Sequence, residues 1–264
     1  MVTQQVQQRY VFGDLLRKWR ESRKISQLTL AAKAEVSPRH LSFVETGRSV
    51  PSRGMVLRLA EHLEVPLRER NQLLLAAGYA PVYTETALQA PRLSMVLTAI
   101  RKVLAGHDPY PALVVDRTWN MVEANASTAM LIEGAPADLM AEPFNVLRFS
   151  LHPRGLAPRI VNLTEWRNHI LDRLERQVRA TADPQLGELY QELLGYPAGN
   201  GDVDTEFMAG DVVVPMRLRH DDRELSLFST VTTFGTPRDI TVEELAIESF
   251  YPADQETSEY LRSR

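Results

Sequence analysis

The feature that most constrains this chain is a pair of short amphipathic helical patterns, within ISQLTLAAKAEV and VSPRHLSFVETG, that are separated by only about three residues, Glu35 to Ser37. Ser26 and Ser37 are good helix N-caps, Pro38 suits the first helical position of the second segment, and Gly47 suits its end. A connection this short forces two helices to cross steeply. The sequence therefore predicts a helix-turn-helix unit whose second helix can enter a DNA major groove.

Helical segments on both sides of this pair complete a small bundle. In FGDLLRKWRESR, Phe12, Leu16 and Trp19 recur at helical spacing and are expected in the core. PSRGMVLRLAEHLEV and PLRERNQLLLAAGYAP have the same kind of apolar periodicity, and each stops at a proline. We therefore expect residues 1–80 to form an all-α five-helix bundle that contains the helix-turn-helix.

Charge is divided unevenly between the two parts of the chain. Residues 1–80 contain 13 Lys and Arg against 7 Asp and Glu, whereas residues 81–264 contain 17 against 27. A basic head on an acidic body is typical of a nucleic-acid-binding head, although a chance distribution gives the same totals. The charge pattern favours DNA as the partner of the bundle.

The stretch SQLTLAAKAEVSPRHLSFVETGRSVPS resembles the phage-repressor-like (Xre) helix-turn-helix family, and the resemblance covers roughly residues 10–79. Many members of that family have glycine at the turn position that Glu35 holds here. Glu35 is therefore expected to adopt a left-handed backbone conformation at some energetic cost. The residues that carry the resemblance are Ser26-Gln27, Leu30-Ala31, Ser37, Glu45-x-Gly47-Arg48 and Pro51-Ser52.

The resemblance implies contacts with double-stranded DNA. Arg39 and Phe43 occupy positions that face base edges in relatives, where Arg39 suits a guanine and Phe43 suits a thymine methyl group. Gln27, at the start of the preceding helix, is expected to hold a backbone phosphate. For His40 and for the capping serines, a role in the helix itself is at least as good an explanation. The expected DNA-binding residues are Gln27, Ser37, Arg39, His40, Phe43, Arg48, Ser52 and Arg53.

A different pattern begins after a polar linker at residues 81–90. Two short strands in PALVVDRTWNMVEAN are followed by amphipathic helices, the longest in LTEWRNHILDRLERQVRATA, and then by three antiparallel strands. This order predicts an α+β PAS-like domain with an antiparallel sheet over residues 91–264. PALVVDRTWNMVEAN, NVLRFSLHP and DPQLGELYQELL also resemble the ligand-binding domain of MmyB-like transcription regulators over about residues 91–256.

PAS-like sheets and their helices enclose an apolar cavity that suits a small lipophilic ligand, and the MmyB-like resemblance points to a fatty-acyl molecule. Each apolar candidate is more often plain core than pocket wall. Arg148, His152 or Arg154 could anchor a carboxylate, or could be ordinary loop charges. The expected ligand-binding residues are Leu113, Val115, Trp119, Met121, Leu147, Phe149, Trp166, Phe228 and Phe234.

No catalytic or metal site is expected from the sequence. It has no cysteine, no tight pair of histidines, and no nucleophile, zinc or phosphate-loop motif. No apolar run approaches the ~20 residues of a membrane span, and the N-terminus lacks a signal peptide. We expect a non-enzymatic, cytoplasmic, nucleoid-associated regulator that binds DNA as a homodimer, with no cofactor apart from a lipophilic ligand. The alternative is a DNA-binding protein whose second domain serves only dimerisation or partner binding.

Overall fold

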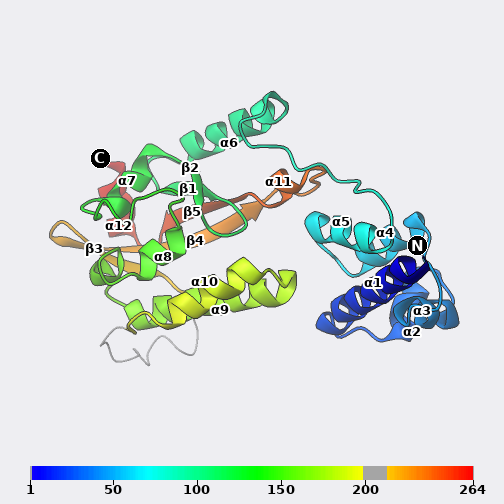
Figure 1. Ribbon diagram of the computed structural model, residues 1–264. Coiled ribbons are helices and arrows are strands. Elements are labelled where there is room, and N and C mark those ends of the chain that lie inside the picture. Colours follow the sequence, from blue (N-terminus) through cyan, green and yellow to red (C-terminus); the bar gives the residue numbers. More distant parts are fainter. Residues whose placement is uncertain (1, 199–212, 264) are drawn as a thin grey trace. The chain divides into compact units, whose positions relative to one another are not determined.

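The computed structural model describes residues 2–198 and 213–263, which divide into two compact units (Figure 1). The first unit comprises Met1–Thr86 together with Thr236–Glu243, and we call this second piece the strap. The second unit comprises Ala87–Gly235 together with Glu244–Arg264. The chain therefore passes between the units three times.

The first unit contains the five-helix bundle that the sequence predicts. Its helices share one core, in which Phe12, Leu16, Leu30, Leu41 and Leu59 are almost completely inaccessible to solvent. The helices are α1 (Val2–Ser22), α2 (Gln27–Lys33), α3 (Pro38–Glu45), α4 (Arg53–His62) and α5 (Leu67–Ala76).

Serine side chains set the start of three of these helices. Ser26, Ser37 and Ser52 each accept a hydrogen bond from a backbone N–H three residues further on, at 3.0, 3.1 and 3.3 Å. Each hydroxyl thereby satisfies an N–H that has no partner inside its helix. Because α2 and α3 follow each other so closely, they form the expected helix-turn-helix.

The strap completes the first unit from far along the sequence. It contains the short helix α11 (Ile240–Glu243). Glu243 accepts the backbone N–H of Leu67 at 2.7 Å, at the start of α5, where the residue before the helix makes no side-chain cap. Asp239 accepts the hydroxyl of Thr86 at 2.6 Å. The strap is therefore hydrogen-bonded both to α5 and to the segment that follows it.

The second unit is built on one antiparallel five-stranded sheet with the order β2-β1-β5-β4-β3, which is the expected PAS-like arrangement. In its register, Leu113 lies opposite Glu248 and Phe228 lies opposite Tyr251. The strands are β1 (Ala112–Val115), β2 (Met121–Ala124), β3 (Met216–His220), β4 (Arg223–Thr233) and β5 (Ala246–Pro252). The helices are η1 (Pro91–Leu93), α6 (Ser94–His107), η2 (Ala126–Thr128), α7 (Ala129–Ile132), α8 (Val146–Leu151), η3 (Ala157–Arg159), α9 (Leu163–Thr181), α10 (Pro184–Leu194) and α12 (Gln255–Arg262).

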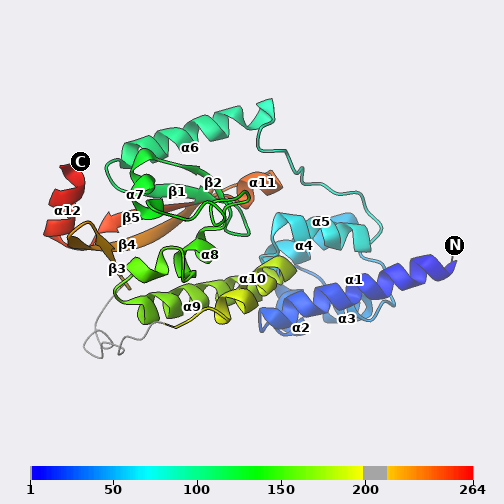
Figure 2. The same ribbon diagram turned by 60° about the vertical axis from the view of Figure 1, so that its left-hand side comes forward.

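Helices cover both faces of this sheet (Figure 2). On one face, α6 packs Ile100 and Leu104 against Val114 and Ile247. On the other face lie α8, α9 and α10, which form the larger core. Because successive strand residues point to opposite faces, Ile247 faces α6 whereas its neighbour Glu248 faces α9. This alternation decides which side chains can reach the space between the sheet and α9.

Candidate DNA interface and ligand pocket

Two arginines and a phenylalanine cluster on the outer side of α3. The guanidinium carbons of Arg39 and Arg48 lie 5.3 and 5.9 Å from the centroid of the Phe43 ring. Both arginines are exposed. Within residues 2–198 and 213–263, no ion pair joins either guanidinium to a carboxylate. Both charges are therefore available to phosphates or to base edges.

The end of α3 explains how Arg48 returns over Phe43. Gly47 has a φ of 69°, in the left-handed region that glycine adopts without a steric penalty. The backbone N–H of Arg48 donates to the carbonyl of Phe43 at 2.8 Å, which is the long hydrogen bond of a Schellman turn. Leu41 and Val44 are buried on the inner side of the helix, so the aromatic ring and the cations share the outer side.

A buried carboxylate holds α3 against the two helices before it. Glu45, which is 1% exposed, accepts two hydrogen bonds from Arg20 at 2.7 and 3.0 Å and one from the Gln27 amide at 2.7 Å. The hydrogen bond to Glu45 raises the pKa of the Arg20 guanidinium above its ordinary value. One amide hydrogen of Gln27 is thus occupied, and only the second remains for a phosphate.

The other expected DNA contacts lie on α3, on α4 and at the caps of these two helices. The hydroxyl oxygens of Ser37 and Ser52 cap α3 and α4, His40 is half-buried, and Arg53 is exposed at the first position of α4. Glu35, in the turn, has a φ of 54°, which is the left-handed conformation that the sequence predicts. Five of the eight expected residues therefore lie on α2, on α3 or at the cap of α3, Arg48 follows α3, and Ser52 and Arg53 lie at the start of α4.

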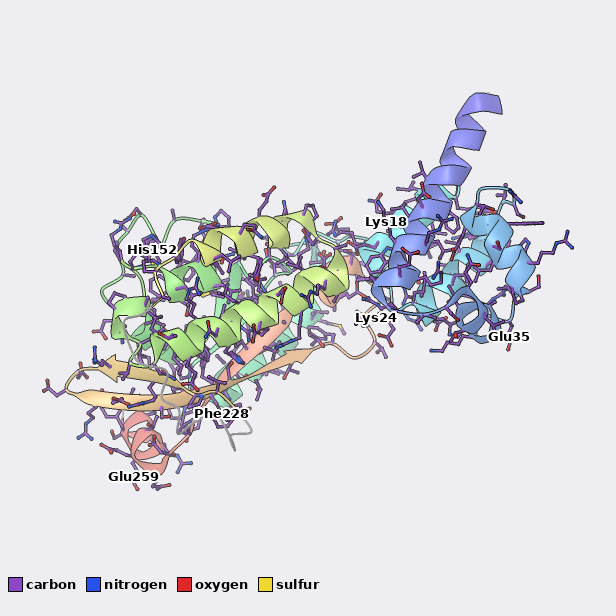
Figure 3. All side chains as sticks on the ribbon, turned by 90° about the horizontal axis from the view of Figure 1, so that it is seen from below. Lys18, Lys24, Glu35, His152, Phe228 and Glu259 are labelled. Carbon is purple, nitrogen blue, oxygen red and sulfur yellow. The ribbon has the colours of Figure 1, made fainter. Side chains whose placement is uncertain are left out.

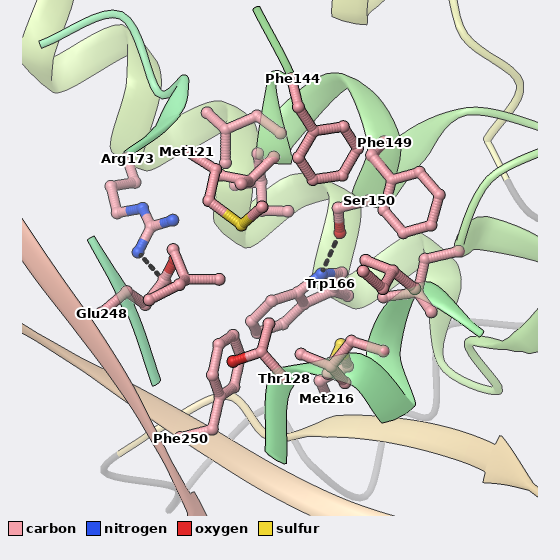
Figure 4. A pocket seen from close by; sticks show the side chains of 17 residues that line it. Met121, Thr128, Phe144, Phe149, Ser150, Trp166, Arg173, Met216, Glu248 and Phe250 are labelled. Atoms are coloured by element: carbon pink, nitrogen blue, oxygen red, sulfur yellow. Dashed lines mark hydrogen bonds and ion pairs between the residues drawn. The ribbon is translucent and has the colours of Figure 1, made fainter. Parts of the chain in front are cut away.

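A cavity of about 50 Å³ lies within the second unit, between the sheet and helices α7, α8 and α9 (Figure 4). Thirteen of its 17 lining side chains are apolar, which makes it a site for lipophilic groups. The lining consists of Leu113, Met121, Thr128, Leu131, Ile132, Phe144, Val146, Leu147, Phe149, Ser150, Leu156, Trp166, Ile170, Arg173, Met216, Glu248 and Phe250.

The expected ligand-binding residues divide between this cavity and other places. Val115 and Trp119 are buried in the same core but outside the lining. Phe228, labelled in Figure 3, stacks on Tyr251 at 5.4 Å on the face of the sheet that points away from the cavity. Phe234 packs with the α6 core instead. The expected residues that do line the cavity are Leu113, Met121, Leu147, Phe149 and Trp166.

The three expected anchors for a carboxylate lie outside the lining. Arg148 makes a two-pronged pair with Glu192 at 2.7 and 2.8 Å, and this pairing lowers the pKa of the Glu192 carboxyl. Arg154 forms an exposed ion pair, and His152 packs edge-on against Tyr196. Each side chain therefore has a partner of its own away from the cavity.

An ion pair in the cavity wall was not predicted from the sequence. Arg173 donates through Nη1 to Glu248 at 2.9 Å, and the Ser229 hydroxyl donates to the same carboxylate oxygen at 3.0 Å. Arg173 follows Ile170 by three residues and Trp166 by seven, so it lies on the apolar stripe of α9. A charged residue on an apolar stripe is the signal that could have revealed the pair.

Across residues 2–198 and 213–263, no group of His, Asp and Glu side chains is arranged to hold a metal ion. Among these residues, no helix is long and apolar enough to cross a membrane.

Two solved structures and two family models match parts of this chain. The crystal structure of the clp gene regulator ClgR from Corynebacterium glutamicum is 25% identical, with 38% of this chain and 87% of that chain covered and a TM-score of 0.24. The structure of an RNA-binding light-oxygen-voltage receptor is 15% identical, with 96% of this chain and 59% of that chain covered and a TM-score of 0.27. No curated protein matches.

The family models match both units in the expected order. A helix-turn-helix domain matches residues 11–73, and the MmyB-like transcription regulator ligand binding domain matches residues 96–263. The first match includes the arginine–phenylalanine cluster of α3, and the second includes the whole lining of the cavity. Since the second match alone covers more than half of the chain, this protein belongs to the MmyB-like transcription regulators and is a DNA-binding regulator with a small-molecule ligand domain.

Proposed function

We propose that this regulator reads a specific DNA sequence and is controlled by a small lipophilic molecule, with fatty-acyl compounds as the first class to test. The observation that carries the proposal is the cavity of the ligand-binding domain, whose lining is mostly apolar. Moving apolar surface from water into such a site contributes roughly 25 cal/mol per Å². A ligand that binds only the folded state then stabilises the protein by mass action.

The DNA-binding part of the proposal rests on the cluster of Arg39, Phe43 and Arg48. A single head offers few contacts, so useful affinity requires two heads on an inverted repeat, bound by a homodimer. The acidic second domain repels DNA and is therefore the natural place for the dimer contact. We propose a cytoplasmic, nucleoid-associated protein without an enzymatic step, because its work is on the chromosome.

A continuous stretch of chain can carry a signal from the cavity to the head. Glu248 and Phe250 of the lining belong to β5, and the strap lies just before β5 in the sequence. In the first unit, Glu243 of the strap caps α5 through Leu67. A ligand that moves β5 can therefore act on the helix-turn-helix unit, provided that it binds two states of the protein with different affinity.

One alternative has an observation in its favour. The cavity volume of about 50 Å³ is small for a ligand with a long chain, so entry requires lining side chains to move. If they do not move, the second domain is only a dimerisation or protein-partner module. Met121 and Met216, whose flexible side chains line the cavity, are the groups most able to yield.

Thermal melts of the delipidated full-length protein test the proposal. Fatty-acyl compounds of increasing chain length should raise the melting temperature, and the best of them should change affinity for DNA fragments selected by the protein. Met121→Trp, which fills the cavity, should abolish the gain. Phe228→Trp, a substitution on the far face of the sheet, should leave it intact. If no chain length changes the melting temperature, the result would favour the alternative in which the second domain is only a dimerisation or protein-partner module.

A further inference from the structure

One buried polar atom in the cavity wall has no partner. Among the residues that the structure describes, Arg173 Nε is the lining atom that is closed to solvent and makes no hydrogen bond. The two hydroxyls of the lining, in contrast, both have hydrogen-bond partners. Thr128 donates to the Ala112 carbonyl at 2.9 Å, and Ser150 accepts from the Trp166 indole at 3.1 Å. Buried polar groups normally have a partner, so the free N–H marks a place for a ligand acceptor.

The unpartnered group is held in a fixed position. The guanidinium carbon of Arg173 lies 4.3 Å from the centroid of the Trp119 ring, and its Nη1 is bonded to Glu248. Figure 4 shows Arg173 and Glu248 together on one side of the pocket, with Phe149 away from them. The cavity thus has its two charged side chains at one end of a mostly apolar wall, which suits an amphiphile.

The charge at this polar end is already balanced. Arg173 and Glu248 form an ion pair whose side chains are 18% and 5% exposed. Nearby, burial lowers the pKa of His169, and Arg173 and Arg176 lower it further against the opposite effects of Glu248 and Asp172, which favours the neutral imidazole. A carboxylate head group would bring a second negative charge beside Glu248 in apolar surroundings. A carbonyl oxygen could accept from Nε and leave the net charge unchanged.

We propose that the cavity selects neutral acyl derivatives, such as esters, lactones and amides, over free carboxylic acids. In this assignment Arg173 Nε donates to the ligand carbonyl, and Glu248 excludes a carboxylate. The inference rests on the proposed function, because it names the ligand class of the same cavity.

Matched ligands separate the head group from the chain. Delipidated full-length protein is titrated at neutral pH with octanamide, methyl octanoate, octanoate and octane, and binding is followed by tryptophan fluorescence, to which Trp166 of the cavity lining contributes. Octanamide and methyl octanoate should bind about tenfold more tightly than octanoate, a difference of ~1.4 kcal/mol. Octane should bind more weakly than octanamide, since it leaves Arg173 Nε without an acceptor.

Two variants test the assigned roles. Glu248→Gln removes the negative charge at nearly constant shape, so octanoate should gain about tenfold while octanamide changes little. Arg173→Lys keeps the positive charge but removes Nε–H, so octanamide and methyl octanoate should lose their advantage over octane. Arg167→Lys is the control, because Arg167 is on the same helix but outside the lining. Circular dichroism establishes that each variant is folded.

The outcomes distinguish the two levels of the argument. If octane and octanamide bind equally well, the lipophilic pocket stands and the head-group proposal is overturned. If octanoate binds more tightly than octanamide, or if Glu248→Gln leaves the ranking as it was, the role of Glu248 is wrong. If none of the four compounds binds, the head-group proposal is overturned, and the proposed function fails as well if longer acyl chains also leave the melting temperature unchanged.

Discussion

The Arg39 guanidinium rests on the Phe43 ring and meets no carboxylate within the described residues. A guanidinium held in this way near the start of a recognition helix is ready to donate two parallel hydrogen bonds to guanine. We therefore expect Arg39→Ala to weaken operator binding by about 1–3 kcal/mol and to relax preference at one base pair. Titrations on operator and on random DNA check this, and equal losses on both would leave Arg39 with a phosphate contact alone.

Arg48 also lies near the Phe43 ring, and it follows the glycine turn that ends α3. That position favours the phosphate backbone. Arg48→Ala should weaken binding to operator and to random DNA alike, and it should reduce the slope of log affinity against log salt concentration by about one. Lys102→Ala, an exposed change in the second unit, is the control and should leave the slope unchanged. An unaltered slope for Arg48→Ala would remove that residue from the backbone contacts.

Gly13 allows α1 to lie directly against the end of α3. A Cβ at this position would lie 2.4 Å from the carbonyl oxygen of Glu45, and rigid backbone cannot yield. Gly13→Ala should therefore lower the free energy of unfolding by about 1–3 kcal/mol. Gly54 in α4 has open space where a Cβ would go, so Gly54→Ala should instead raise stability by about 0.5–1 kcal/mol. Urea denaturation measures both, and equal effects would contradict the close approach of α1 and α3.

The strap contributes a carboxylate, Asp239, whose charge is expected to stabilise the first unit. Burial raises the pKa of Asp239, but hydrogen bonds from Thr86 and Thr84 outweigh it, so the net pKa is below the ordinary value. A depressed carboxyl pKa stabilises the fold above the unfolded value of ~3.9, and this contribution is lost as the pH falls through the folded pKa.

We expect Asp239→Ala to lower stability at neutral pH by about 1 kcal/mol or more, since it leaves Thr84 and Thr86 without their acceptor. Below about pH 4 the difference from the natural chain should shrink, because protonated Asp239 already lacks its charge. Asp222→Ala, in the exposed β3–β4 turn, is the control. Denaturation curves across pH check the prediction, and a constant difference down to acid pH would contradict the role of the charge.

Local features of the fold were open to prediction from the sequence, because their causes lie a few residues apart. The serine caps, the glycine turn after α3 and the left-handed Glu35 all follow from the residue and its immediate neighbours. The strap was not open to such reasoning. Asp239 and Thr86 are 153 residues apart in the chain, and α11 is only four residues long, too short for a periodic pattern.

Five of the nine expected ligand-binding residues line the candidate pocket, and the register of the sheet explains why Phe228 does not. An apolar strand residue can face either layer, and Phe228 faces the one away from the cavity. Alternation along β4 carries that information, since Leu225 and Leu227 are buried on the inner face. Arg173 and Glu248 were missed for a different reason. Each has a charge that apolar pattern matching leaves out, and only the pairing across α9 and β5 shows that they meet.

The division of charge between the two parts of the chain bears on how two copies can assemble on DNA. The basic residues gather in the first 80 positions, and the remainder has an excess of acidic ones. In the homodimer that we propose, DNA would attract the basic part and repel the acidic part, so a contact through the second unit would keep both heads free. In such a dimer the distance between the heads, and with it the fit to an operator, depends on the state of the second unit.

This assembly leads to a prediction about operator geometry. If two heads bind one face of the duplex, the half-sites should lie about one helical turn apart, ~10–10.5 bp from centre to centre. An insertion of about half a turn, ~5 bp, would rotate one half-site to the opposite side of the DNA and should reduce affinity to that of a single half-site. An insertion of a full turn returns the two half-sites to the same side of the DNA but leaves them further apart. It should therefore recover part of the lost affinity only if the second units can change the distance between the two heads. Titrations of the full-length protein on these three duplexes, together with sedimentation of the complexes, measure both effects. If the half-turn insertion leaves the affinity unchanged and sedimentation shows one protein chain per duplex, the protein binds as a monomer.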